Sequence, residues 1–167
     1  MKNKGVLFLA QAAMIAAVYV VLTFVFAPIS FGGVQVRISE ALTILPIFTP
    51  AAIPGLFVGC LLGNFLGGAV LWDVLCGSIA TLIGAVFTYL LRKHSRFLAP
   101  LPPILSNTLI VPFVLRYAYG TMLPISLLMV TVGVGEILSC GGLGLLLAAV
   151  LGKYRTQIFK NFAAGQQ

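Results

Sequence analysis

Long stretches without a charged side chain are the feature that most limits what this chain can fold into. Ten Lys and Arg and three Asp and Glu are spread over 167 residues, and 60% of the residues are hydrophobic. A soluble domain of this length needs far more polar surface, because its outside faces water. The pattern therefore predicts an all-α integral membrane protein, with residues 1–167 forming a single domain whose outside faces lipid.

The positions of prolines and charges divide the chain into six elements. About 20 apolar residues are needed to cross a hydrocarbon core of ~30 Å. We expect full spans at residues 5–27, 51–69, 73–92, 102–119 and 124–151, and a short, broken element at 40–48. One helix from 40 to 73 would be too long for one crossing, and Pro46, Pro50 and Pro54 interrupt it. The Pro and Gly residues of 28–33 predict a loop after the first span.

The basic residues predict the orientation of these six transmembrane helices. An even number of spans places the N and C termini on the same side, and the positive-inside rule assigns that side to the cytoplasm. The cytoplasmic side then holds Lys2, Lys4, Arg92, Lys93, Arg96, Lys153, Arg155 and Lys160. All three carboxylates fall toward the outer side, together with Arg37 and Arg116.

Several classes of function are not expected. The basic residues form three separate juxtamembrane groups without aromatic residues between them, so we expect contact with anionic lipid and no nucleic acid partner. Cys60, Cys76 and Cys140 have neither CxxC spacing nor a neighbouring His pair, so we expect packing roles, with no metal and no cofactor. His94 lies in a basic loop, which argues against an enzyme. The chain has no phosphate-binding GxxxxGK[ST] loop, so a gradient or another protein must supply energy.

Polar residues in the outer half of the predicted bundle are the candidate binding site. A charge near the bilayer centre costs about 2.5 to 3.5 kcal/mol on insertion scales, which usually indicates function. The candidate residues are Gln35, Arg37, Glu40, Asn64, Trp72, Asp73, Asn107, Arg116 and Glu136. Three carboxylates and two arginines suit a planar, polar, neutral or cationic solute, whereas the acids would oppose a phosphate.

Structural roles are the alternatives for these charges. Glu136 can form an ion pair with Arg116, and Arg37 can pair with Glu40 three residues later on a helix. Asp73 can stabilise the N-terminus of the fourth span.

Small residues form stripes on two predicted helices. Glycines recur at positions 55, 59, 63 and 67, and alanines at 12, 13, 16 and 17. Such stripes allow close helix contact, either inside the protein or with a docking partner. The alanines offer two overlapping AxxxA registers.

A family resemblance covers nearly the whole chain. The most specific segment is ISFGGVQVRISEAL at 29–42, followed by TPAAIPG at 49–55, Gly63-Asn64, Leu71-Trp72-Asp73, GSIAT at 77–81, LPP at 101–103, Asn107 and GVGE at 133–136. These segments closely resemble the QueT family of queuosine-precursor transporters. The resemblance implies the substrate-binding S component of an energy-coupling factor (ECF) transporter in a prokaryotic plasma membrane. It implies six helices and an outward-facing site closed by the loop after the first helix.

The resemblance also implies partners and a cargo. A membrane scaffold subunit and two ATPase subunits would be separate chains, and Ala13 and Ala17 resemble the motif with which S components dock on the scaffold. The expected substrates are 7-deazaguanine bases, meaning queuine or its aminomethyl or cyano precursor. A stand-alone secondary transporter, an intramembrane enzyme acting on lipid, and an S component for a flavin or thiamin are the alternatives.

The polar residues can be matched to such a base as a hypothesis. Glu136 or Glu40 would accept the N–H donors of the guanine-like edge, because charge-assisted pairs are strong. The donor to the exocyclic oxygen would be Arg37, Gln35 or Asn107. Asp73 would meet an ammonium on the side arm, and Trp72 would stack on the ring or close it from water.

Overall fold

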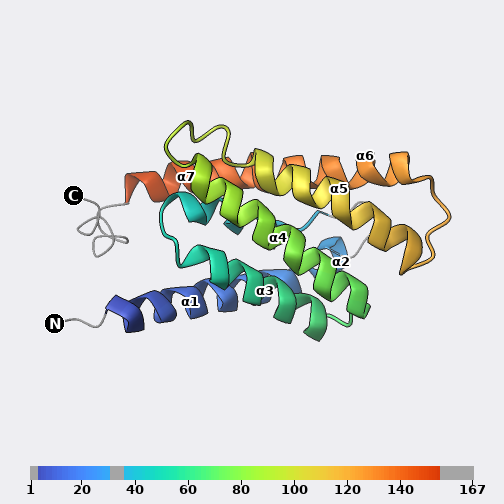
Figure 1. The fold of residues 1–167 in the computed structure, drawn as a ribbon, viewed down its shortest axis with the longest axis horizontal. Helices are drawn as coiled ribbons and strands as arrows, with labels where there is room; N and C mark the ends of the chain where they lie inside the picture. Colours follow the sequence, from blue (N-terminus) through green and yellow to red (C-terminus); the bar gives the residue numbers. More distant parts are fainter. Residues whose placement is uncertain (1–3, 31–35, 155–167) are drawn as a thin grey trace.

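The computed structural model describes residues 4–30 and 36–154, and every regular element in these ranges is a helix. The elements are α1 (Lys4–Val25), α2 (Ala27–Ser30), η1 (Ile38–Ile47), α3 (Ala52–Leu66), α4 (Leu71–Leu91), α5 (Leu101–Tyr117), α6 (Ile125–Glu136), η2 (Ile137–Leu143) and α7 (Gly144–Lys153) (Figure 1). The 3₁₀-helix η1 and the π-helix η2 are the irregular members. Elements α6, η2 and α7 follow without a break and form the long last helix that the sequence predicted at 124–151.

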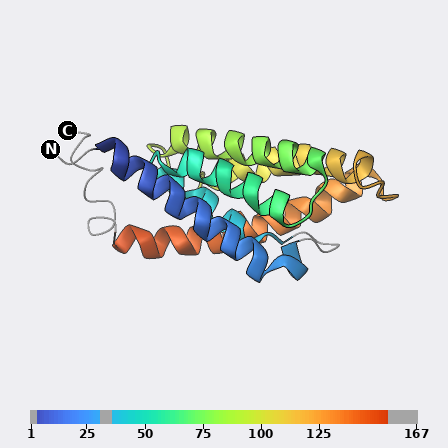
Figure 2. The same cartoon turned by 90° about the horizontal axis from the view of Figure 1, so that it is seen from below.

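The helices pack as an elongated bundle. Neighbours along the chain pack on one another, α3 on α4, α4 on α5 and α5 on α6, while α1 packs on α3. The start of α1 and the end of α7 lie at the same end of the bundle (Figures 1 and 2). The basic loop after α4 reaches that end too, because Arg96 lies beside Gly152 near the end of α7.

Among the described residues, three helices are long and apolar enough to cross a membrane: Lys4–Val25, Leu71–Leu91 and Ile125–Lys153. They match the expected spans at 5–27, 73–92 and 124–151. Element α3 is shorter than the expected span at 51–69, since its 15 residues extend about 22 Å. The predicted short element at 40–48 is η1.

One expectation about the first loop was wrong. We expected no helix at residues 28–33, but α2 forms a helical turn at Ala27–Ser30. Proline is tolerated there because the first turn of a helix makes no intrahelical N–H bonds. Residues 31–35 lie outside the described part of the chain.

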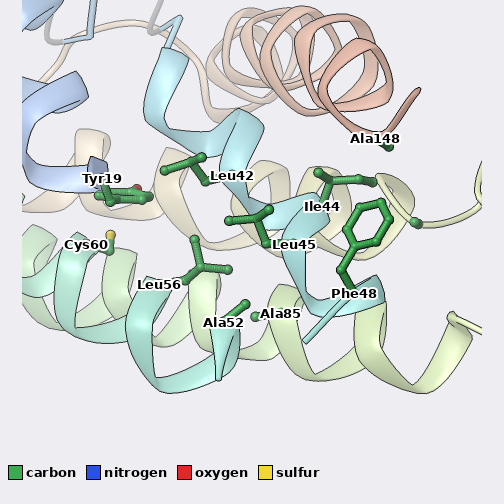
Figure 3. Close-up of a cluster of buried hydrophobic side chains, with 11 residues drawn as sticks. Tyr19, Leu42, Ile44, Leu45, Phe48, Ala52, Leu56, Cys60, Ala85 and Ala148 are labelled. Atoms are coloured by element: carbon green, nitrogen blue, oxygen red, sulfur yellow. The ribbon is translucent and has the colours of Figure 1, made fainter. Parts of the chain in front are cut away.

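Element η1 forms the centre of the bundle. Eight of its residues, 39–46, are buried, and it contacts α1, α3, α4, η2 and α7. In Figure 3, Leu42 and Leu45 of η1 lie beside Tyr19 of α1 and Leu56 of α3, in one cluster of buried side chains. The core is thus built around a helix that has no face toward lipid.

The glycine stripe of α3 packs against α1, as the internal-packing interpretation predicted. A Cβ atom on Gly55 would lie 2.7 Å from the carbonyl oxygen of Ala12, and one on Gly59 would lie 3.1 Å from the Cα of Ala16. Ala12 and Ala16 are therefore buried in this contact. The other alanine register, Ala13 and Ala17, is exposed on the outer surface.

Candidate functional site

The three carboxylates of the chain are buried in the bundle. Glu40, Asp73 and Glu136 expose 0%, 2% and 3% of their surface. Glu40 lies in η1, a 3₁₀-helix of 10 residues, although runs beyond three or four residues are uncommon. Glu136 is the last residue before the π-helix η2, a conformation that is frequent at functional sites. Irregular backbone therefore positions two of the three acids.

Glu40 is held through one of its two oxygens. Tyr19 donates its hydroxyl to Oε1, and the hydroxyl of Thr81 donates to the same atom over 3.3 Å. Oε2 is buried and accepts no hydrogen bond from the described residues. The side chain is thus oriented by donors from α1 and α4, with one oxygen left to accept from a ligand.

Glu136 is held in a similar way. The amide Nδ2 of Asn107 donates to Oε1 over 3.1 Å, and the thiol of Cys140 donates to Oε2 over 3.1 Å. The Cys140 sulfur also lies 3.4 Å from the carbonyl oxygen of Glu40. One ligand atom from each of Glu40, Glu136 and Cys140 lies within 4.8 Å of the others, so these three buried residues could hold a metal ion.

Arg37 connects a second group of polar residues. Its Nη2 donates to Oδ1 of Asn64 over 3.1 Å and lies 3.8 Å from Oδ2 of Asp73. Tyr119 donates its hydroxyl to the same Oδ2 over 2.9 Å. Burial and the neighbouring carboxylate of Asp73 raise the pKa of Tyr119 to about 12, so this phenol remains a donor at neutral pH.

The two groups form one network through Cys60. Its sulfur lies 3.6 Å from Nδ2 of Asn64 and 3.4 Å from the hydroxyl of Thr81, which also reaches Glu40. We call this set the buried polar network; its members are Tyr19, Arg37, Glu40, Cys60, Asn64, Asp73, Thr81, Asn107, Tyr119, Glu136 and Cys140.

These contacts decide between the structural alternatives for Arg37 and Arg116. Arg37 forms its salt bridge with Asp73 instead of Glu40. Arg116 donates to the carbonyl oxygen of Thr121 over 2.7 Å and lies outside salt-bridge distance of Glu136. Asp73 lies in the first turn of α4, where its charge can stabilise the helix N-terminus as that alternative expects, and the N-cap of that helix has no side-chain hydrogen bond.

Three predicted site residues do not join the network. Trp72 is 66% exposed and lines a groove of about 250 Å³ between α4 and α5. The other residues around the groove are Cys76, Phe113, Val114, Tyr117 and Ala118. Arg116 is half-buried at the end of α5. Gln35 lies outside the described residues.

Five members of the network were not among the predicted site residues: Tyr19, Cys60, Thr81, Tyr119 and Cys140. A sequence signal existed for two of them. The hydroxyl of a tyrosine within an apolar helix usually finds a partner when buried, and Tyr19 lies well inside α1. Cys140 follows Glu136 by four residues, which places both side chains on one helix face. The predicted packing role for the cysteines was therefore incomplete.

The distribution of side chains defines the class of protein. The three carboxylates, Arg37 and the amides of Asn64 and Asn107 lie inside. Large apolar side chains such as Leu9, Met14, Leu71 and Leu146 are exposed on the outer faces of the helices. Together with three helices of membrane-crossing length, this describes a multi-pass membrane protein with a polar interior.

Comparison with known proteins identifies the family. Residues 9–153 match the family described as "QueT transporter", and the chain belongs to that family. A curated relative is the "Queuosine precursor transporter QueT" of Lactococcus lactis subsp. cremoris (strain MG1363), with 35% identity over 86 residues. That match covers 50% of this chain and 50% of the relative, so it spans about half of the relative's length. No solved structure matches the chain. The resemblance found in the sequence is thereby confirmed.

Proposed function

We propose that this protein is the substrate-binding S component of an ECF-type importer. Its cargo would be a queuosine precursor, a 7-deazaguanine base such as queuine or its aminomethyl or cyano precursor. The family match supports this cargo class. The observation that carries the proposal is the buried polar network, because ionisable groups inside an apolar bundle are costly and usually serve a ligand or ion.

The network offers the groups that a guanine-like edge needs. That edge presents N–H donors beside an exocyclic oxygen, so it requires a carboxylate next to a donor. Buried carboxylate oxygens without a described donor occur at Glu40 and Asp73. Donors lie nearby in Arg37 and Asn107. The stacking role of Trp72 and the roles of Gln35 and Arg116 stay predictions.

The proposed topology has six spans with both termini in the cytoplasm. Support comes from the basic residues at the ends of α1, α4 and α7 and in the loop after α4, which share one end of the bundle: Lys4, Arg92, Lys93, Arg96 and Lys153. Asp73, at the start of α4, lies at the opposite end of that helix. The positive-inside rule then makes the basic end cytoplasmic.

The proposed partners are a scaffold membrane subunit and two ATPase subunits. Docking would use Ala13 and Ala17, which are exposed. The competing register, Ala12 and Ala16, is covered by α3. This burial favours the Ala13 register over its neighbour.

Two measurements test the proposal. Calorimetry on the purified protein in detergent, without any ATPase, should show tight binding of a 7-deazaguanine, with guanine and riboflavin as controls. Uptake by cells should require co-expressed scaffold and ATPase subunits. Binding of riboflavin alone would indicate another S-component cargo, and uptake without the ATPases would indicate a secondary transporter.

A further inference from the structure

The buried polar network contains three carboxyl groups and one cationic side chain. Arg37 lies 3.8 Å from Asp73, which gives that carboxylate an ionic partner. Within residues 4–30 and 36–154, no Lys, Arg or His nitrogen lies within salt-bridge distance of Glu40 or Glu136. Ligand atoms of these two acids lie within 4.8 Å of each other. Like charges this close are stable together only with a cation or a shared proton.

Hydrogen bonds orient this pair of acids toward a ligand. Tyr19 and Thr81 hold Oε1 of Glu40, and Asn107 holds Oε1 of Glu136. Oε2 of Glu40 has no donor among the described residues, and Oε2 of Glu136 meets a thiol, which is a weak donor. Both second oxygens are therefore available to a strong, charged donor.

The network around Asp73 has a different character. Oδ2 of Asp73 already accepts from Tyr119 and faces Arg37, while Oδ1 is buried without a described donor. Gly77 lets these groups pack closely against α4, since a Cβ there would lie only 3.3 Å from Oδ1 and 3.2 Å from Nδ2 of Asn64. This group combines acceptor and donor atoms with nearly balanced charge, which suits a neutral edge better than a cation.

We propose that the carboxylate pair Glu40 and Glu136 binds a protonated amine of the ligand, and that the group around Asp73 and Arg37 binds the base edge. This inference rests on the proposed function, and it reverses the assignment that the sequence suggested. A ligand with an ammonium on its side arm supplies positive charge and N–H donors to the pair. A nitrile in the same place presents a lone pair to two acids, which is repulsive. The site therefore selects amine-bearing 7-deazaguanines over the cyano precursor.

The test compares ligands that differ only at the side arm. Calorimetry in the presence of EDTA, which keeps metal ions from the pair, measures the aminomethyl, hydroxymethyl and cyano derivatives on the wild-type protein. We expect the aminomethyl compound to bind about ten- to a hundredfold more tightly than either neutral compound. Equal affinities for the three would overturn the inference and leave the proposed cargo class intact. If none of them binds the folded protein, the proposed function fails, and the inference fails with it.

Two matched variants locate the amine. Glu136→Gln should reduce the preference for the aminomethyl compound to a few fold, whereas Asp73→Asn should weaken all three ligands by similar factors. The ratio of affinities is the readout, so a general loss of binding does not imitate the result. A preference that survives Glu136→Gln but disappears in Asp73→Asn would place the amine at Asp73 and overturn the assignment.

Discussion

At the scale of single residues, the buried polar network depends on neutral donors that hold charged acceptors. Tyr19 is the clearest example, because its ring is part of the apolar core and its hydroxyl donates to Glu40. Without that donor, Oε1 would keep only the 3.3 Å contact with Thr81. A buried carboxylate that loses a hydrogen bond keeps its desolvation cost.

The variant Tyr19→Phe should therefore lower the free energy of unfolding by about 1 to 3 kcal/mol. Thermal unfolding in detergent measures the change, and Tyr117→Phe, at a side chain that is 77% exposed, is the matched control. A melting temperature equal to that of the control would show that the hydroxyl does not stabilise the network.

The candidate site was only partly predictable from the sequence at this scale. Arg37, Glu40, Asn64, Asp73, Asn107 and Glu136 stood out because charges and amides are conspicuous in apolar segments. Their pairing was not predictable, because Arg37 lies three residues from Glu40 in the chain yet contacts Asp73 on another helix. Thr81 and Cys60 are common in apolar helices, so nothing in their local sequence separates a network member from a packing residue.

At the scale of elements, the close contact of α1 with α3 sets the position of Tyr19 relative to Glu40. The contact depends on Gly59, where a Cβ would lie 2.8 Å from the Cβ of Tyr19. Both of these atoms are near the backbone, so a clash there must shift a helix.

We expect Gly59→Ala to destabilise the protein by about 1 to 3 kcal/mol, the usual cost of overpacking. Thermal unfolding again provides the measurement. Gly5→Ala is the control, because a Cβ on Gly5 has nothing within 4 Å. If Gly59→Ala is as stable as Gly5→Ala, the two helices do not pack as closely as described.

The long helices were predictable, whereas the conformations of η1 and η2 were not. Apolar length and bounding charges locate α1, α4 and the last helix. The prolines near η1 indicated a broken element, but its 3₁₀ form depends on burial against α1, α3, α4, η2 and α7. The apolar sequence at Ile137–Leu143 is equally compatible with an α-helix. The π conformation that it adopts could therefore not be predicted.

At the scale of the whole molecule, the outer surface combines apolar side chains for lipid with a small-residue face on α1. Ala13 and Ala17 are exposed there, which is the arrangement expected for a docking face. Substrate binding and docking would then use separate parts of the protein. Helix α1 connects them, because it carries the exposed alanines on one face and Tyr19, a member of the buried polar network, on another.

A bulky residue on this face should impair docking and leave substrate binding intact. We expect Ala17→Leu to reduce uptake at least about tenfold in cells that contain the scaffold and ATPases, because close helix packing requires small residues. Binding to the purified protein should remain unchanged. Ala149→Leu, at another exposed alanine, is the matched control. Normal uptake by Ala17→Leu would exclude this face from docking.

The most direct test of the account is the affinity of queuine for Glu136→Gln, measured by calorimetry beside the wild-type protein and Lys93→Gln. Lys93 is exposed in the basic loop, so its change controls for the loss of one charge. If the buried polar network is the binding site, Glu136→Gln should weaken binding by at least about tenfold, as expected for a charge-assisted contact, while Lys93→Gln binds like wild type. Equal affinities of the two folded variants would contradict the placement of the site.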